Sequence, residues 1–281
     1  MKSLSRLGYG CVRLTSCRNL SDAQTLINKV LASNIRYFDT APAYGQGYSE
    51  KILGTCLTKS LVPREEYIIS TKLGTWPHGN TNIPTPLALR LKQLARKVNR
   101  LRAGKENAHG LNYPNESVAW QPAANPTLLS LADARNTVEK SLKALKTDYL
   151  DILLLHELLP SSLTDKAKDY LFTLRTQGII NRLGIAANGS NYLSHTQGDF
   201  SGWDVLQYEY GANWPAHDTL KNQFPLMHHV IHSCVGKRRF GDLLPTESLK
   251  KTIQQFPQGT VLFSSLNPEH IRQNALIANI A

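Results

Sequence analysis

Short apolar runs alternate along this chain with segments of helical periodicity, and this alternation most constrains the fold. Runs such as 67–71 and 149–155 have the length of a strand and are almost continuously apolar. Strands of this kind are typical of a parallel sheet covered by helices. Eight strand and helix pairs can be counted, which is the complement of a closed (β/α)8 barrel. The periodicity by itself predicts the α/β class and leaves an open sheet as the alternative.

The expected elements fill most of the chain. We expect strands at 7–12, 35–39, 67–71, 149–155, 182–187, 205–208, 230–233 and 260–264. We expect helices at 22–32, 49–58, 129–145, 164–176, 247–255 and 268–278, with short helices near Tyr192 and Leu220. Ser21 followed by Gln24 resembles a capping box and predicts the start of the first helix.

Four polar side chains stand just after, or at the end of, successive predicted strands. They are Asp39, Tyr44, Lys72 and His156. Taken singly, each has a structural explanation: a turn residue, a packed aromatic, a surface charge and a core histidine. The carboxyl ends of parallel barrel strands converge on one face, so the four together favour a shared site for proton transfer.

These four groups suit the reduction of a carbonyl, which needs a general acid beside the developing alkoxide. Tyr44 is the candidate acid, with an ordinary phenol pKa of about 10. A nearby Lys72 ammonium should stabilise the phenolate and lower that pKa, while Asp39 should keep the lysine charged and in position. His156 is expected to orient the carbonyl or to assist proton transfer.

The local sequences around these residues resemble the aldo-keto reductase family. The similar motifs are 39–45 followed by Ser49-Glu50 and Leu53-Gly54, then Thr71-Lys72, then 153–156. The resemblance runs from Arg6 to about Asn274. It implies an α/β (β/α)8 TIM barrel with a long insertion after the third strand, and the four residues as the catalytic tetrad of an NAD(P)-dependent oxidoreductase.

The same resemblance assigns candidate cofactor contacts in the later strands. It implies that Gln207 binds the nicotinamide carboxamide and that His232 stacks on the ring, although His232 is equally explained as a strand-end histidine. Ser264 and His270 stand where many NADP-dependent members have a lysine and an arginine, so both NADPH and NADH remain candidates. The expected cofactor-binding residues are Gln207, Asn188, His232, Ser233, Ser265, His270 and Asn274, with Arg272 as a further contact.

A long insertion interrupts the alternation between 74 and 126. It is rich in proline, asparagine and glycine, and it is far longer than an ordinary connection. We expect it to lie at the mouth of the site, with Trp76 in the substrate pocket or, alternatively, as a packing anchor. Because 281 residues suit one large barrel and leave no room for a second full domain, residues 1–281 are predicted to form one barrel domain.

A basic amphipathic helix is predicted within the insertion. Leucine and valine recur from 87 to 101 at helical spacing, and 90–105 holds seven basic residues and no acidic one. Three interpretations remain open: a helix that packs its leucines on the barrel, a surface for an acidic partner or an anionic membrane, and nucleic-acid binding. The last is disfavoured because no aromatics are interleaved with the basic residues.

Composition limits the remaining classes. The chain has 281 residues, 41% of them hydrophobic, and a net charge of +11. No apolar run approaches the roughly 20 residues of a membrane span, and no secretion signal is recognised, so a cytoplasmic protein is expected. Four cysteines without paired spacing predict reduced thiols. Nine histidines without ligand spacing predict no metal site.

The sequence therefore predicts an NAD(P)H-dependent oxidoreductase that interconverts an aldehyde or ketone with its alcohol. The substrate is expected to be a small carbonyl compound, with sugars among the candidates. A second interpretation stays open: a catalytically weak or inactive cofactor-binding protein that acts as a regulator or scaffold through the basic insertion. Fold alone does not choose between them.

Overall fold

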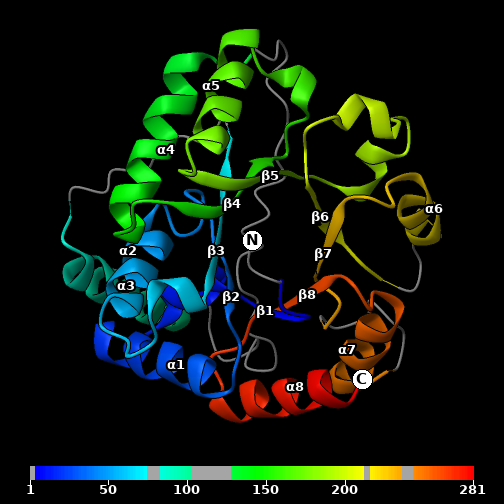
Figure 1. Cartoon of the computed structure of the whole chain (residues 1–281). Helices are drawn as coiled ribbons and strands as arrows, with labels where there is room; N and C mark the ends of the chain where they lie inside the picture. The colour runs from blue at the N-terminus through cyan, green and yellow to red at the C-terminus, as the bar shows by residue number, and fades with distance from the viewer. Residues whose placement is uncertain (1–3, 75–82, 103–127, 212–215, 236–242) are drawn as a thin grey trace.

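A computed structural model describes residues 4–74, 83–102, 128–211, 216–235 and 243–281. Eight parallel strands pair in chain order and close into a barrel, β1 to β8 (Figure 1). The predicted (β/α)8 barrel is thus confirmed. The strands are β1 Leu7–Gly10, β2 Tyr37–Asp39, β3 Ile68–Leu73, β4 Leu150–His156, β5 Ile180–Ala186, β6 Val205–Glu209, β7 His228–His232 and β8 Thr260–Phe263.

Helices surround the barrel on its outside (Figure 1). Each predicted helix is present, with ends shifted by a few residues at most. The helices are α1 Leu20–Ala32, α2 Tyr48–Leu57, α3 Thr85–Arg102, α4 Leu131–Leu145, α5 Asp165–Thr176, α6 Ala216–Gln223, α7 Pro245–Gln255 and α8 Pro268–Ile280, with a short 3-10 turn η5 at Gly189–Tyr192.

Side-chain alternation divides each strand between two cores. One set of strand residues faces the barrel axis and packs there as a compact cluster around Tyr37, Ile152 and Val230. The alternate set packs outward against the helices in a larger core. Because alternate residues share a face, Asp39, Lys72 and His156 fall on the inward side, at the end of the barrel toward which the strands run.

The N-terminal caps of the helices differ in part from those predicted. The side chain of Asn19, rather than Ser21, caps α1 by accepting from the Asp22 amide at 2.8 Å, so the predicted capping box was wrong. Thr164 caps α5 by accepting from the Ala167 amide. Gly54 lets α2 approach α4 closely, since an added Cβ would lie 2.5 Å from the carbonyl oxygen of Ala144.

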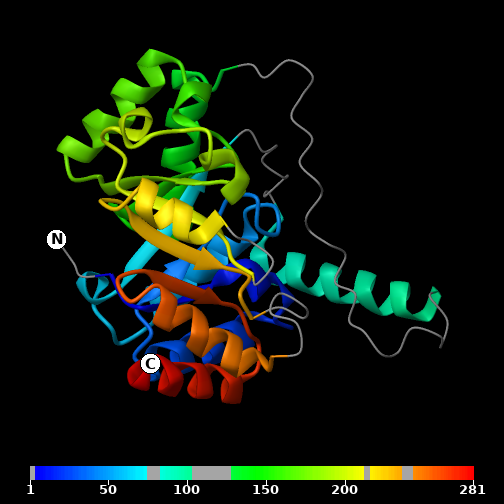
Figure 2. The same ribbon diagram turned by 90° about the vertical axis from the view of Figure 1, so that its right-hand side faces the viewer.

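Helix α3 lies in the predicted insertion, between β3 and α4, and extends away from the barrel (Figure 2). Its first turns contact the barrel through buried Ala88 and Leu89. Leu87, Leu91 and Leu94 are 48%, 46% and 59% exposed. Of the three interpretations left open, the one in which the helix packs its leucines on the barrel therefore does not hold for these three. The full extent of the insertion stays a prediction, because 75–82 and 103–127 lie outside the described residues.

Over the described ranges, none of the helices combines the length and the apolarity that crossing a bilayer would require.

Candidate active site

An ion pair between Lys72 and Asp39 forms the floor of the site. The Lys72 ammonium donates to both carboxylate oxygens of Asp39, at 2.8 and 2.7 Å, and to the carbonyl oxygen of Thr40 at 2.9 Å. Lys72 is 2% exposed and Asp39 3% exposed. Lys72 lies inside β3, one residue before its end, and Asp39 is the last residue of β2. Neighbouring strands therefore bring the two charges together.

Tyr44 lies in the tight loop that follows β2. Its amide donates to the Ala41 carbonyl at 3.0 Å, and the next residue, Gly45, has a φ of +59° against the side chain of Thr15. Glycine adopts this left-handed conformation without strain, so the loop can turn directly after Tyr44. The Tyr44 ring then lies with its centroid 4.9 Å from the Lys72 nitrogen and 6.1 Å from the centroid of His156, edge to face.

Burial and charge act in opposite directions on the Tyr44 phenol. Burial raises its pKa, the Lys72 charge lowers it, and the net pKa lies above the ordinary value. The expected lowering by Lys72 is thus present but outweighed. For Lys72, burial lowers the pKa, but the charge of Asp39 and its hydrogen bonds raise it by more, so the amine stays protonated. The site holds a neutral phenol beside a fixed cation.

His156, the last residue of β4, is held as a neutral imidazole. Burial lowers its pKa to about 3, and the charges of Lys72 and His232 act in the same direction. A neutral imidazole has one N–H donor and one acceptor nitrogen. His156 can therefore hydrogen-bond a carbonyl oxygen beside Tyr44 without adding a positive charge.

Gln207 extends this network toward the place expected for a cofactor. Its side-chain amide donates to Asp39 Oδ1 at 3.2 Å, while its buried Oε1 accepts no hydrogen bond from any residue that the structure describes. Its strand pairs with β5 through Ala186, which itself pairs with His156. A buried acceptor without a donor is costly, and a ligand carboxamide N–H would satisfy it. The residues present thus fit a nicotinamide.

Comparison with known proteins shows the family to which the chain belongs. The model of the aldo/keto reductase family matches residues 6–221, which is most of the chain. The chain belongs to the aldo/keto reductase family.

Among curated relatives, uncharacterized oxidoreductase YqkF of Bacillus subtilis is 26% identical over 191 residues, 68% of this chain and 47% of that protein. D-threo-aldose 1-dehydrogenase of a Pseudomonas species is 27% identical over 199 residues, 68% of this chain and 53% of that protein. The chain thus spans about half the length of these curated relatives.

Solved structures share the fold over nearly the whole chain. Aldo-keto reductase AKR11C1 from Bacillus halodurans, described as a holo form, superposes with a TM-score of 0.64 at 18% identity, covering 97% of this chain and 86% of its own. Aldo-keto reductase MGS-M4 from a deep-sea metagenome gives a TM-score of 0.66 at 19% identity, covering 97% and 85%. At such identities the likeness shows the fold.

Two of the residues expected to bind the cofactor, His232 and Ser233, lie at the end of β7, where the barrel strands finish. His232 ends β7 and makes a 2.9 Å hydrogen bond with Ser233. Its charge also acts on His156. Asn188 differs: it is exposed, and its Oδ1 accepts from the amide and the hydroxyl of Ser190, so it caps η5. A cofactor contact through Asn188 Oδ1 would compete with that cap, whereas the side-chain NH2 group takes no part in it.

The expected adenosine end lies at the start of α8. The Ser265 hydroxyl accepts from the Asn267 amide at 3.1 Å and lies 3.4 Å from His270 Nδ1, and Asn274 is almost fully buried on the same helix. Arg272 donates two hydrogen bonds to the carboxylate of Glu269, at 3.0 and 2.7 Å. This cation is therefore neutralised by a carboxylate in the first turn of the helix.

Glu50 is a buried carboxyl on the helix side of β3, close to the tetrad, whose surroundings the sequence did not indicate. It is buried in α2 and accepts a hydrogen bond from the Thr71 hydroxyl at 2.6 Å. Thr71 directly precedes Lys72 in β3. Burial raises its pKa to about 7, with the Thr71 hydrogen bond acting in the opposite direction. The sequence feature that could have indicated its burial is the Ser49-Glu50 motif, which belongs to the family resemblance.

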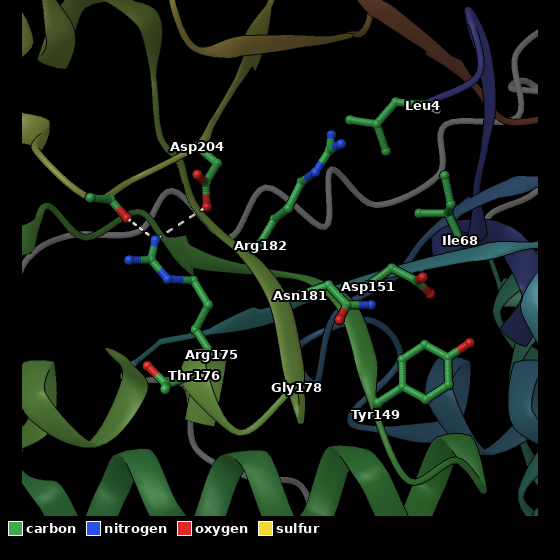
Figure 3. Close-up of a pocket in the computed structure, with 11 residues that line it drawn as sticks. Leu4, Ile68, Tyr149, Asp151, Arg175, Thr176, Gly178, Asn181, Arg182 and Asp204 are labelled. Carbon is green, nitrogen blue, oxygen red and sulfur yellow. Dashed lines mark hydrogen bonds and ion pairs between the residues drawn. The ribbon is translucent and has the colours of Figure 1, made fainter. Parts of the chain in front are cut away.

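A cavity of about 1070 Å³ lies at the other end of the barrel (Figure 3). Its lining comes from the beginnings of strands, including Ile68, Asp151 and Arg182. Figure 3 shows Arg175 turned toward Asp204, 3.5 Å away, and Arg64 pairs with Asp151 at 2.7 Å. These carboxylates and cations neutralise one another in pairs. None of Asp39, Tyr44, Lys72 and His156 lines the cavity.

The remaining expectations concern Trp76, the cysteines and the histidines. Trp76, expected in the substrate pocket, lies outside the described residues. All four cysteines are buried and no disulfide joins them. Across the portions of the chain that the structure describes, no three His, Cys, Asp or Glu side chains gather as metal ligands.

Proposed function

We propose that this protein is an NAD(P)H-dependent oxidoreductase that interconverts an aldehyde or ketone with its alcohol. The observation that carries the proposal is the buried Lys72–Asp39 ion pair beneath the Tyr44 ring, with neutral His156 beside it. Burying two charges is costly unless they are paired. A pair placed next to a phenol and an imidazole at the carboxyl ends of barrel strands supports a catalytic role.

Each of the four residues has a proposed role in reduction. When bound, a nicotinamide would supply the hydride that the carbonyl carbon needs. Tyr44 donates its phenol proton to the carbonyl oxygen as negative charge develops there, and the Lys72 ammonium stabilises the resulting phenolate. Asp39 holds that ammonium in place. His156 donates a hydrogen bond that orients the carbonyl oxygen, and the alcohol oxidation is the reverse of these steps.

The cofactor is proposed to lie across the ends of the later strands. Gln207 Oε1 would accept from the carboxamide, and Ser265 and Asn274 would hold the adenosine end. Arg272 is already neutralised by Glu269, and a serine and a histidine stand at the two positions where a lysine and an arginine often bind the extra phosphate. A carboxylate in the first turn of α8 also disfavours a phosphate there, so this arrangement supports NADH over NADPH.

Sugars are proposed among the substrates. The likeness to a protein named D-threo-aldose 1-dehydrogenase over 68% of this chain supports this class. In the oxidative direction the anomeric carbon of an aldose in its lactol form would lose a hydride, and Tyr44 would receive the proton of its hydroxyl. In the reductive direction both transfers would be reversed.

Replacing Tyr44 with phenylalanine tests the proposal. Tyr44→Phe should lower turnover of a carbonyl substrate by about 10²- to 10⁴-fold, because the proton donor is lost. Affinity for the cofactor, measured by quenching of tryptophan fluorescence, should stay nearly constant.

Tyr48→Phe is a matched control. It removes a nearby phenol whose hydroxyl donates to the Ile83 carbonyl at 2.9 Å and takes no part in the tetrad, so turnover should be almost unchanged. Full turnover in Tyr44→Phe would refute the mechanism. Cofactor binding by a wild type that reduces no aldehyde, ketone or sugar would support the second interpretation, in which a cofactor-binding barrel acts through α3.

A further inference from the structure

An apolar stripe runs along the outer face of α3 and its approach. Ile83, Leu87, Leu91 and Leu94 are all exposed. At 3.6 residues per turn the three leucines fall within about 60° of one another around the helix. These four are one third of the twelve large hydrophobic residues exposed in the described parts of the chain. A gathering of this kind marks an interaction surface.

The barrel cannot cover this stripe, because α3 is attached to it by another face. Ala88 and Leu89 are buried on that face. The Lys92 ammonium donates to the Gly45 carbonyl at 3.3 Å, and the Gln93 amide donates to the carbonyls of Ser16 and Cys17 at 3.4 Å. These contacts fix the first half of α3 with its leucines turned away from the protein, and Figure 2 shows the helix extending beyond the barrel.

The charge of α3 limits the kind of partner. The sequence 85–102 contains six basic residues and no acidic one, and Arg90 is exposed beside the leucines. A second copy would place one such helix against another and would suffer like-charge repulsion. The complementary surface must therefore be negatively charged and also accept aliphatic side chains.

We infer that α3 docks this protein on an anionic lipid surface, with the stripe inserted at the boundary between headgroups and acyl chains. A single helix that projects from the protein offers a convex surface, and a bilayer accommodates it without a shape-matched groove. A protein partner would need such a groove to bury enough area for stable binding. Basic residues near anionic headgroups add electrostatic attraction that falls off within the Debye length, about 8 Å at physiological ionic strength.

Docking by α3 also orients the catalytic mouth. Lys92 ties the helix to Gly45, the residue after Tyr44. The loop that carries the proposed proton donor is therefore held beside the docking helix. Docking through α3 would be a further property of the protein, separate from carbonyl reduction and independent of it.

Vesicle binding by the full chain tests the inference. Wild type should sediment with vesicles of phosphatidylcholine and phosphatidylserine, fail to sediment with phosphatidylcholine alone, and be released at high ionic strength. The variant L87Q/L91Q/L94Q should lose more than about tenfold in vesicle affinity, since the apolar contribution is removed while glutamine keeps the helix propensity. Neutralising the cations in R96Q/K97Q/R100Q/R102Q should abolish the preference for phosphatidylserine.

A matched control removes two leucines that are as exposed as those of the stripe but lie elsewhere. Leu61 and Leu226 are fully and largely exposed, respectively, so L61Q/L226Q should bind vesicles like wild type. Circular dichroism and cofactor binding should be the same in all variants, which separates lost docking from misfolding. Equal binding to both kinds of vesicle, wild-type binding by the leucine variant, or retention on polyglutamate without any binding to vesicles would overturn the inference; the last would indicate an acidic protein partner.

Discussion

The two ends of the barrel use the same kinds of residue in different ways. At the end where strands begin, Arg175 and Asp204 form a half-exposed pair around a large cavity. At the end where strands finish, Lys72 and Asp39 are almost completely buried beside Tyr44 and His156. Partly exposed pairs contribute little and are screened by solvent, whereas buried charges shift the pKa values of their neighbours. The end with this cavity is therefore not the one where buried charges act on neighbouring groups.

Breaking the buried pair should have the largest effect. Asp39→Asn leaves the Lys72 ammonium buried without its counter-charge, which should cost about 3 to 5 kcal/mol of stability. It should also lower turnover by more than about tenfold, because the ammonium loses the group that holds it. Chemical denaturation and steady-state kinetics measure the two effects.

Asp151→Asn is the matched change at the opposite end. The Asp151 carboxylate accepts from Arg64 at 2.7 Å and from the Ile69 amide at 2.9 Å, so its loss should reduce stability. Turnover per folded molecule should stay within about twofold, since the residue touches no reacting group. Equal losses of turnover in the two variants would show that the ends do not differ as described.

Glu50 offers a pH test of burial near the catalytic end. Its pKa is raised from 4.5 to about 7 by burial, so the folded state holds a proton that the unfolded state has released. Stability should therefore fall as pH rises through this interval, by up to about 3 kcal/mol for a shift of this size.

The variant Glu50→Gln cannot ionise, and its amide oxygen can still accept from Thr71. Its free energy of unfolding, measured by denaturant titration below and above the interval, should lose less with rising pH than that of wild type. A parallel loss in both proteins would mean that Glu50 is not the group that titrates.

Removing a pair at the cavity rim should have a small effect. Arg175→Met keeps much of the side-chain volume and removes the charge that faces Asp204. A stability change below about 1 kcal/mol is expected for such an exposed pair, with unchanged turnover. A thermal melt with an activity assay checks both, and a large loss of activity would assign the cavity end a role in catalysis.

The smallest effect is expected from the titration of His156. With its pKa lowered to about 3 by burial, the imidazole stays neutral over the usual assay range of roughly pH 5 to 8. Turnover of wild type should therefore show no step near pH 6.5 from this residue. A step there that disappears in His156→Gln would contradict a neutral imidazole.

The strands and the tetrad could be predicted because they depend on local patterns. An apolar run followed by a polar residue indicates both a buried strand and its end. Together with the barrel that the family resemblance implied, this predicted that Asp39, Lys72 and His156 lie together. The face that α3 presents could not be predicted in this way. Helical periodicity identifies a stripe of leucines, but only the contacts of Ala88, Lys92 and Gln93 determine which side meets the barrel.

The net result of opposing effects on a pKa could not be predicted from the sequence either. The presence of Lys72 predicted a lowered pKa for Tyr44, and its charge does act in that direction, but burial has the larger effect. Asn188 shows a related limit: the family resemblance suggested a cofactor contact, and the sequence did not indicate that its side chain also caps the turn that follows β5. Both outcomes depend on the surroundings of a residue rather than on its type.

The three acceptors around the Lys72 ammonium have a consequence for the speed of the proposed proton transfer. Two carboxylate oxygens and one main-chain carbonyl, all from 39–40, keep the nitrogen at one point below the Tyr44 ring. The favourable field on the phenol oxygen therefore exists before any charge develops there. Water around a dissolved phenol would have to reorient at that moment. The folded chain has completed this reorganisation in advance.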